Sequence, residues 1–295
     1  MSIDRHGSAR KALNESNIAL KNYAAGEHRV TCPRCSHLRR KKHDKCLAVL
    51  IDEAGATWRC WNCDWTGGAN QGAQICAPSR TASAGFSDTQ LRDMESAARR
   101  WREAAPVKGT PAEIYLRGRS ITCAPPVALR FHPNCWHSEL ERGIPAMLAL
   151  MVDIKTNKPQ GVHRTYLRAD GSGKVQDIAA KKMLGPSGGA CVKLKTDDEV
   201  TEGLAICEGL ETGLSLLSMG WQAVWSALDA GGIERFPVLA GIECLTIFAD
   251  ADDKGSAAAI ACARRWADAG QEARILSPKI DGADWNDVAQ QMVAA

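Results

Sequence analysis

The sequence contains no long hydrophobic run. Its longest apolar stretches, such as residues 146–152, reach about seven residues, whereas a membrane-spanning helix needs about 20. The N-terminal segment MSIDRHGSARK has no apolar core of the kind found in secretory signals. These absences exclude a membrane protein and predict a cytoplasmic one. In that setting the 12 cysteines are expected to be reduced thiols and metal ligands rather than disulfides.

The net charge is also small, +3 over 295 residues, but it is unevenly distributed. Residues 199–295 contain 6 Lys and Arg against 15 Asp and Glu, a net charge of −9. Residues 1–198 contain 31 against 19, a net charge of +12. The front part is therefore expected to bind a polyanion, and the acidic back part would repel phosphate unless it binds cations.

The residue patterns predict four segments. Residues 1–68 contain a helix at 9–25, closed by Gly26, and a cysteine-rich block. Residues 69–87 are rich in Ala, Gly and Ser and are expected to be a flexible linker. Residues 88–198 begin with helices at 88–105 and 110–119, and the runs AMLALMVDI and GVHRTYLR then predict a β-hairpin around KTNKPQ. In residues 199–295 the short apolar runs LAIC, QAVW, CLTIF and ARIL alternate with helical patterns, which indicates a parallel sheet.

Two CxxC pairs in the first segment predict a zinc site. Cys32 and Cys35 form one pair, and Cys60 and Cys63 form the other. Two such turns supply the four thiolates that Zn²⁺ prefers in a tetrahedral structural site. A ribbon this short has no adequate core without its metal. Cys46 lies on an apolar strand pattern and is expected to be in the core.

Basic and aromatic residues surround these pairs. Arg39 and Arg40 belong to the basic run LRRKKHDK, and Trp61 lies between two further tryptophans, at positions 58 and 65. Such residues suit single-stranded DNA, because phosphates take the charge and bases stack on the rings. The alternatives are a solvated charge run and tryptophans that pack the ribbon.

The stretch LTIFADADDKG, residues 245–255, places three carboxylates directly after an apolar run. If the strand continues through it, its two-residue period puts Asp250 and Asp252 on one face and leaves Asp253 to cap the next helix. Paired carboxylates at the carboxyl end of a parallel strand lie where open α/β sheets bind ligands. A divalent cation relieves their repulsion.

Further acids follow two other predicted strands. In GLAICEGLETGLSLL, Glu208 lies on the turn after the strand, and Glu211 lies in the first turn of the next helix, where the helix dipole favours a carboxylate whatever its function. In DGADWND, Asp284 either lines the same cleft or caps a helix. We therefore expect a catalytic site that binds Mg²⁺ or Mn²⁺ together with substrate phosphates, made by Glu208, Asp250 and Asp252 first and Asp284 second.

The motifs ICEGLETGLS, IFADADDKG and DGADWND resemble the three acidic motifs of the Toprim fold, which DnaG-type primases, type IA and II topoisomerases and some nucleases share. Residues 32–68 resemble the zinc-binding domain of bacterial and phage primases. Between them, GTPAEIYLRGR, LRFHP, GVHRTYLR and KKMLGPSGGA are similar to Toprim-containing primases of phages, plasmids and integrated elements. Nearly the whole chain thus resembles a DnaG-type DNA primase.

The resemblance implies an α/β fold with an N-terminal zinc ribbon, a mixed α+β basic lobe and a C-terminal Toprim domain with a Rossmann-like parallel sheet. It makes Glu208 the family's glutamate, Asp250 and Asp252 the metal-binding pair, and Asp284 the first aspartate of the third motif. It also places Arg164, Lys181 and Lys182 near nucleotide and template phosphates, although the residues alone are equally consistent with solvated surface. This chain departs from the family at Thr212 and Asn286, where acids are expected, and in its first zinc pair, which is often Cys and His.

A primase would synthesise short RNA primers from NTPs on a single-stranded DNA template, with two Mg²⁺ held by the acids. One alternative is a Toprim nuclease, which would not need a zinc ribbon before a basic lobe. Another is a non-catalytic zinc-dependent single-strand binder, which Thr212 and Asn286 favour. A topoisomerase needs a tyrosine nucleophile, and Tyr23, Tyr115 and Tyr166 lie in no evident nucleophile setting. The chain ends within about ten residues of DWND, so a replicative helicase would be a separate partner.

Overall fold

The computed structural model describes residues 5–38, 42–43, 45–52, 55–60, 63, 65–70, 86–280 and 282–294. The chain divides into two compact units, Met1–Ala84 and Gly85–Ala295. No helix in the described ranges is both long enough and apolar enough to cross a membrane. The linker predicted at residues 69–87 falls largely on residues 71–85, outside those ranges.

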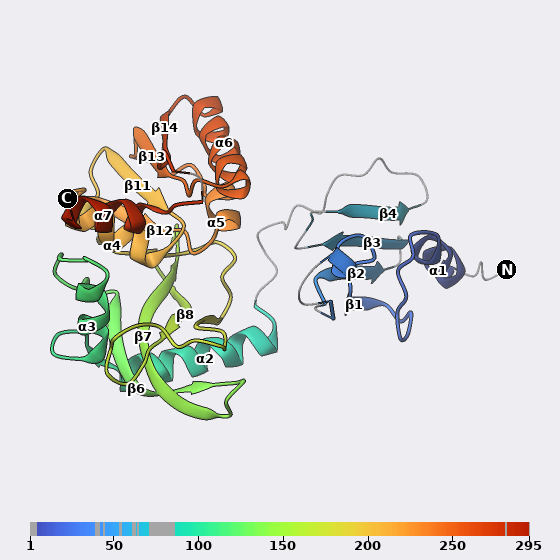
Figure 1. Ribbon diagram of the computed structural model, residues 1–295. Coiled ribbons are helices and arrows are strands. Elements are labelled where there is room, and N and C mark those ends of the chain that lie inside the picture. Colours follow the sequence, from blue (N-terminus) through green and yellow to red (C-terminus); the bar gives the residue numbers. More distant parts are fainter. Residues whose placement is uncertain are drawn as a thin grey trace. The chain divides into compact units, whose positions relative to one another are not determined.

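The N-terminal unit contains one α-helix and a four-stranded antiparallel sheet among its described residues (Figure 1). Its elements are α1 (Arg5–Glu15), β1 (Gly26–Val30), η1 (Ser36–Leu38), β2 (Leu47–Asp52), β3 (Gly55–Cys60) and β4 (Thr66–Asn70), and the strands pair in sequence order. Leu47, Val49 and Ile51 alternate along β2 and are buried in one core with Leu13 of α1. The strand period of two therefore sets which side chains of β2 form this core.

Helix α1 ends ten residues earlier than the pattern over 9–25 predicts. Asn17 adopts a left-handed conformation with φ 57°, which stops a helix and which asparagine tolerates better than most residues. The next residue, Ile18, is buried in the core. The apolar residues beyond Glu15 thus belong to an irregular segment.

The C-terminal unit begins with a mixed region of helices and antiparallel strands. This region contains α2 (Asp88–Glu103), β5 (Ala105–Pro106), α3 (Pro111–Gly118), β6 (Leu129–His137), β7 (Arg142–Asp153), β8 (Pro159–Tyr166), β9 (Lys181–Leu184), β10 (Ala190–Lys193) and η2 (Asp197–Glu199). A capping box between Ser87 and Gln90 starts α2. The predicted hairpin is confirmed by the antiparallel pairing of β7 with β8.

Alternating strands and helices complete this unit. They are β11 (Gly203–Cys207), α4 (Leu210–Ser218), β12 (Val224–Ser226), α5 (Ala230–Glu234), β13 (Cys244–Phe248), α6 (Asp253–Asp268), β14 (Glu272–Leu276) and α7 (Trp285–Ala294). β11 is parallel to β12 and β13, and β13 is parallel to β14. This confirms the α/β fold with a C-terminal parallel sheet.

Within residues 86–294 that the structure describes, all the strands join in one ten-stranded sheet. The order is β14-β13-β11-β12-β10-β7-β6-β5, and β8 pairs with β7 and β9. Strand β10 is antiparallel to both β12 and β7. The mixed region and the parallel region therefore share one framework in a fixed register.

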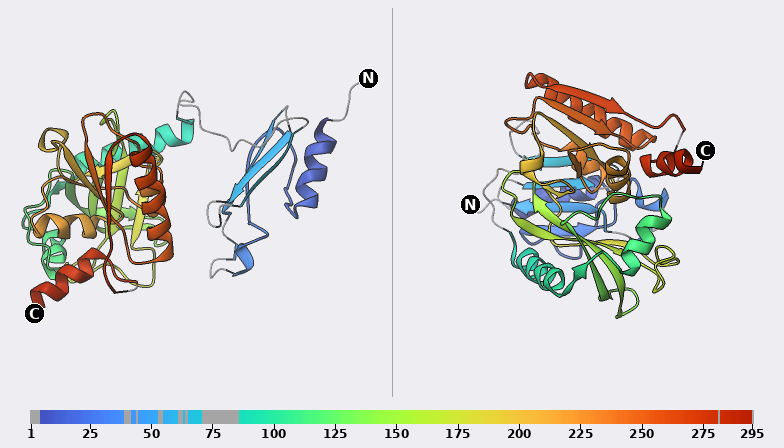
Figure 2. Two further views of the ribbon diagram at one scale, coloured as in Figure 1. Left: turned by 90° about the horizontal axis from the view of Figure 1, so that it is seen from above. Right: turned by 90° about the vertical axis from the view of Figure 1, so that its left-hand side faces the viewer.

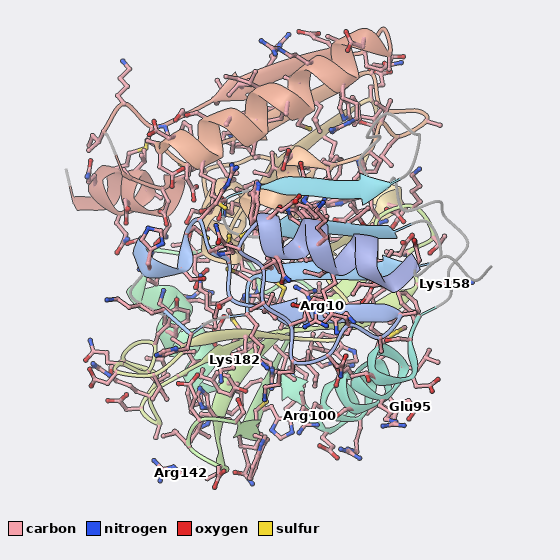
Figure 3. The ribbon with its side chains drawn as sticks, turned by 90° about the vertical axis from the view of Figure 1, so that its right-hand side faces the viewer. Arg10, Glu95, Arg100, Arg142, Lys158 and Lys182 are labelled. Carbon is pink, nitrogen blue, oxygen red and sulfur yellow. The ribbon has the colours of Figure 1, made fainter. Side chains whose placement is uncertain are left out.

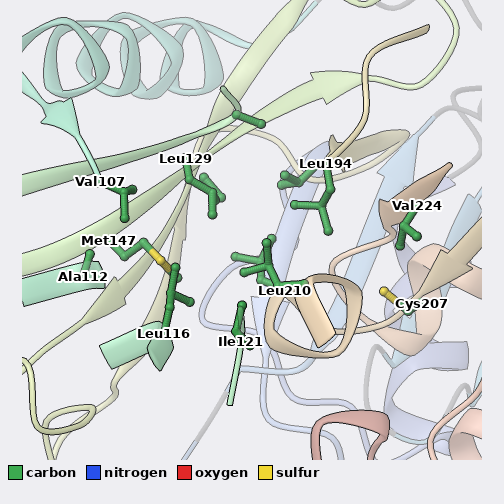
Figure 4. Close-up of a cluster of buried hydrophobic side chains, with 14 of the residues drawn as sticks. Val107, Ala112, Leu116, Ile121, Leu129, Met147, Leu194, Cys207, Leu210 and Val224 are labelled. Atoms are coloured by element: carbon green, nitrogen blue, oxygen red, sulfur yellow. The ribbon is translucent and has the colours of Figure 1, made fainter. Parts of the chain in front are cut away.

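The parallel strands face two cores. Cys207 of β11 lies in the same core as Leu210 of α4, together with Met147 of β7 (Figure 4). The neighbouring Ile206 faces the other core, with Trp266 of α6. Helices α4 and α7 thus cover one face of these strands, and α5 and α6 cover the other (Figure 1 and Figure 2).

Candidate functional site

The carboxyl ends of the parallel strands open onto a cavity of about 200 Å³. Glu208 follows β11 directly, and Asp250 comes two residues after the end of β13. Because β11 and β13 are parallel neighbours, their carboxyl ends meet at one edge of the sheet. The lining of this acidic cavity includes the carboxylates of Glu208, Glu211, Asp250 and Asp284 and the basic side chains of His163 and Lys181.

The carboxylates raise one another's proton affinity. Burial, with the nearby charges of Glu208 and Asp284, raises the pKa of Asp250 to about 7. Burial also raises the pKa of Glu208. The charge of Lys254 lowers this pKa, and the charges of Asp229 and Asp252 raise it. The Oδ1 atom of Asp250 is buried and has no hydrogen-bond partner. An unpartnered buried carboxylate oxygen among other acids is a place where a cation is strongly favoured.

Asp252 lies beside the cavity but has a local bond of its own. It is the N-cap of α6, and its side chain accepts a hydrogen bond from the Gly255 amide at 2.6 Å. The sequence assigned the cap to Asp253, and that assignment is wrong, because β13 ends at Phe248 and the strand period does not reach Asp252. The charge of Asp252 still raises the pKa values of Asp250 and Glu208.

Asp284 fulfils both of the alternatives that the sequence left open, lining the cavity and capping a helix. It lines the acidic cavity, and its Oδ1 atom accepts the backbone amides of Asn286 and Asp287 at 2.8 and 2.9 Å, at the start of α7. Asn286 itself is buried and is not among the residues that line the acidic cavity. Its Nδ2 atom donates to the carbonyl of Arg119 and to Ser215, which ties α7 to α4.

The other wall of the cavity comes from the mixed region. Lys181 of β9 places its Nζ 2.8 Å from Oε2 of Glu211, and the hydroxyl of Tyr115 donates to Oε1 of Glu211 at 2.8 Å. Burial alone would raise the pKa of Glu211, but the charge of Lys181 and these two hydrogen bonds outweigh it and lower the pKa to about 2. Glu211 is therefore ionised and holds Lys181 at the cavity.

Arg164 and Lys182 lie on the opposite face of β8 and β9. These two residues are register partners, and the side chains of a strand alternate between its faces. Arg164 donates to the carbonyls of Trp136 and Met183. Lys182, labelled in Figure 3, contacts Ser138 at 2.7 Å and Glu139 at 2.8 Å. The structure brings Lys181 to the acidic cavity but not these two residues, whose contact with phosphates stays a prediction.

Sequence reasoning passed over three residues of this wall. Glu211 was explained by the helix dipole, Tyr115 was considered only as a nucleophile, and His163 was not considered. Lys174 is near enough to Glu211 for the charge of Glu211 to raise its pKa, although burial outweighs this effect and lowers the pKa. A signal for His163 is its position one residue before Arg164, since a strand that points Arg164 one way points His163 the other.

The four predicted zinc ligands meet in the N-terminal unit. The side-chain sulfurs of Cys32, Cys35, Cys60 and Cys63 all lie within 4.8 Å of one another. The buried sulfur of Cys46 lies next to this group, 3.9 Å from that of Cys35 and 3.7 Å from that of Cys60. The Cys32–Cys63 and Cys35–Cys60 sulfur distances are 3.8 and 3.6 Å. Four sulfurs about 2.3 Å from a tetrahedral zinc would be spaced similarly. The acids, in contrast, surround their cavity without converging on one point.

The predicted template-binding residues are Arg39, Arg40 and Trp61, and all three lie outside the described ranges. Trp58 is 8% exposed and packs in the core of the ribbon. Gly67 lies against its ring, because a Cβ there would come within 2.3 Å of Trp58. Trp65 is half-buried, with the Arg34 guanidinium 4.6 Å from its ring centroid. Trp58 is thus a packing residue.

Family models match two different regions of the chain, and solved structures are similar to larger parts of it. No curated protein matches the sequence. Residues 92–194 match the domain of unknown function DUF7146. A structure of the DnaG primase catalytic domain bound to single-stranded DNA is similar at 15% identity, covering 69% of this chain and 77% of that chain with a TM-score of 0.49.

Two further structures are similar over longer parts of the chain. The zinc-binding and RNA polymerase domains of Aquifex aeolicus primase are 14% identical, covering 99% of this chain and 83% of that chain, with a TM-score of 0.47. The primase fragment of the bacteriophage T7 primase-helicase protein is 12% identical, covering 90% and 95%, with a TM-score of 0.41. Residues 203–295, which contain Glu208, Asp250 and Asp284, match the Toprim family and form a Toprim domain.

Proposed function

We propose that the protein is a DNA primase that makes short RNA primers from NTPs on single-stranded DNA. The observation that carries this proposal is the acidic cavity, which has a volume of about 200 Å³. Its lining includes carboxylates of the Toprim domain and Lys181 of the preceding region. Nucleotidyl transfer requires charge neutralisation at the transferred phosphate and a place for the triphosphate. A cavity with acids on one wall and a lysine on the other offers both.

The acids suit a divalent cation. Asp250 has an unpartnered buried oxygen, and its pKa of about 7 reflects repulsion from its neighbours as well as burial. Carboxylate oxygens are the ligands that Mg²⁺ takes in phosphoryl-transfer sites. Glu208, Asp250 and Asp284 would hold the ion, with Asp252 adding charge nearby. When bound, Mg²⁺ lowers the pKa of an attacking hydroxyl and neutralises phosphate charge.

The four-cysteine cluster would hold a structural zinc ion, since its sulfur spacing fits tetrahedral coordination. The ribbon is small and its core includes the cysteines themselves. Metal binding is therefore expected to contribute to the folding of this unit. Arg39, Arg40 and Trp61 are proposed to contact the template through phosphates and bases.

Two other functions use parts of the same site. A Toprim nuclease would use the acids to cleave DNA, and a non-catalytic protein would bind single strands without chemistry. The primase is favoured because the lysine wall belongs to a region that shares one sheet with the Toprim domain. A zinc ribbon in the same chain also gives a template reader that a nuclease does not need.

The test is an incubation of the zinc-loaded full chain with single-stranded DNA, labelled NTPs and Mg²⁺. Short labelled oligoribonucleotides support the primase, shortened DNA supports the nuclease, and retarded but unchanged DNA supports the binder. Asp250→Asn should reduce primer synthesis about 100-fold or more, as expected for loss of a group that stabilises transition-state charge. Glu243→Gln, an exposed acid just before β13, is the matched control and should leave synthesis unchanged.

A further inference from the structure

His163 lines the acidic cavity beside Lys181 but has no assigned task. It lies on β8, where it pairs with Met183, and the next position on the same face pairs Thr165 with Lys181. His163 and Lys181 are thus diagonal neighbours on one face, a relation that places side chains within about 7–8 Å. Only 6% of His163 is exposed. Two polar side chains of different chemistry therefore meet at one wall.

The imidazole lacks a protein partner. Its Nδ1 atom is buried and has no hydrogen bond. Burial and the charge of Lys181 lower the pKa of His163 to about 4; the charge of Glu211 opposes them, and Arg164 lowers the pKa by a smaller amount. At neutral pH the ring is uncharged, with one nitrogen that donates and one that accepts.

The two side chains suit different parts of one nucleotide. Phosphate oxygens only accept hydrogen bonds, and Lys181 only donates them. A hydroxyl both donates and accepts, which matches a neutral imidazole. In a nucleotide the 5′ carbon joins the sugar to the α-phosphate, so a side chain within about 7–8 Å of a lysine that binds the α-phosphate can reach the sugar.

We propose that His163 hydrogen-bonds the ribose 2′-hydroxyl of an incoming nucleotide whose phosphate lies at Lys181, and that it selects ribonucleotides over deoxyribonucleotides. This inference rests on the proposed primase function and adds the sugar specificity. Glu211 contributes by holding Lys181 at 2.8 Å, so that a phosphate bound to Lys181, and the sugar joined to it, have a defined place. A 2′-deoxynucleotide would leave the imidazole unpaired in the closed site.

An unmade hydrogen bond of this kind is expected to cost roughly 10- to 100-fold in kcat/KM. The test measures kcat/KM for ATP and for dATP on one single-stranded template. The wild-type ratio should be about 10 or more. In His163→Phe the ATP value should fall toward the dATP value, which should itself change little. His163→Gln, which offers both a donor and an acceptor, should keep part of the preference.

Thr165→Val is the matched control. Thr165 lies on the same face of β8, is fully buried and has an unpartnered hydroxyl, so the change perturbs the strand without touching the cavity. It should leave the ratio unchanged. If the wild type makes primers but shows no preference for ATP, or if His163→Phe keeps the full ratio, the inference is overturned and the primase function stands.

Equilibrium binding separates a failure of the proposed function from a failure of the inference. Titrating the wild-type chain and His163→Phe with ATP and dATP in the presence of Mg²⁺ needs no turnover. If no primers form, tighter ATP binding that is lost in the variant supports the sugar contact, and equal binding of the two nucleotides overturns it.

Discussion

Removing the charge of Glu211 should destabilise the C-terminal unit at neutral pH. In Glu211→Gln the side chain keeps its shape, but one acceptor oxygen replaces the two carboxylate oxygens to which Tyr115 and Lys181 donate at 2.8 Å. The variant therefore loses one of these hydrogen bonds together with the charge interaction with Lys181. Because Glu211 is only 5% exposed in its side chain, water does not replace that interaction.

The magnitude follows from the proton affinity of Glu211. Its pKa falls from an ordinary value of 4.5 to about 2, which corresponds to roughly 3 kcal/mol at about 1.4 kcal/mol for each tenfold change in affinity. Lys181 is 40% exposed in its side chain, so solvent screens part of this interaction. We therefore expect Glu211→Gln to lose about 2 kcal/mol of unfolding free energy at pH 7.

The same values give a pH dependence with a definite sign. Glu211 is ionised in the folded chain down to pH about 2 but in the unfolded chain only above about 4.5. Its stabilisation is therefore complete above pH 4.5 and is lost as the pH falls toward 2. The difference between wild type and Glu211→Gln should be constant from pH 8 to 5 and shrink below pH 4.5.

Urea denaturation of the full chain at a series of pH values measures this difference, with the larger m-value identifying the transition of the C-terminal unit. Glu234→Gln, which removes a half-exposed acid from α5 that lies 4.0 Å from Arg235, is the control and should change stability by less than about 0.5 kcal/mol, because an exposed ion pair contributes little. Equal stability of wild type and Glu211→Gln at pH 7, or a difference that stays constant down to pH 3, would refute the reasoning.

Three further outcomes follow from the site. With a chelator present, Asp250→Asn should increase the free energy of unfolding, because the ionised carboxylate of Asp250 is destabilised in the folded chain. The increase should grow from pH about 4 and level off above pH about 7. Mg²⁺ should raise the melting temperature of the wild type but not of this variant. Cys60→Ser should abolish stoichiometric zinc, measured by elemental analysis, whereas Cys46→Ser should retain it, because Cys46 stands outside the group of four. Asn286→Asp should lose about 2–4 kcal/mol in urea denaturation without tighter Mg²⁺ binding, because it sets a carboxylate against the carbonyl of Arg119.

The sequence predicted the parallel strands well because each carries an apolar run of its own. Burial on both faces requires such runs, and LAIC and CLTIF coincide with β11 and β13. Since parallel neighbours end at one edge, the sequence alone predicts that Glu208 and Asp250 lie at the same site. The zinc ligands were predictable for a related reason, since both halves of the cluster are short local motifs.

The lysine wall was harder to predict, because its contacts are distant in sequence. Tyr115 is 96 residues from Glu211, and Lys181 is 30. No local pattern separates a glutamate that stabilises a helix terminus from one that also binds a lysine across the chain. The link through β10 was also not evident, since β10 and β12 have only four and three residues. Short strands carry too little periodicity to indicate their partner.

The pairing of Glu211 with Lys181 bears on why the site needs a metal. If Lys181 were unpaired, its charge would compensate part of the repulsion among Glu208, Asp250 and Asp284. Instead Glu211 already holds its ammonium group at 2.8 Å, and the effect of Lys181 on the pKa of Asp250 is the smallest of its causes. The acids therefore keep an excess of negative charge, which a proton on Asp250 or a divalent cation from solution relieves. Lys181 is at the same time kept at the cavity wall, where a phosphate that arrives with that cation would meet it.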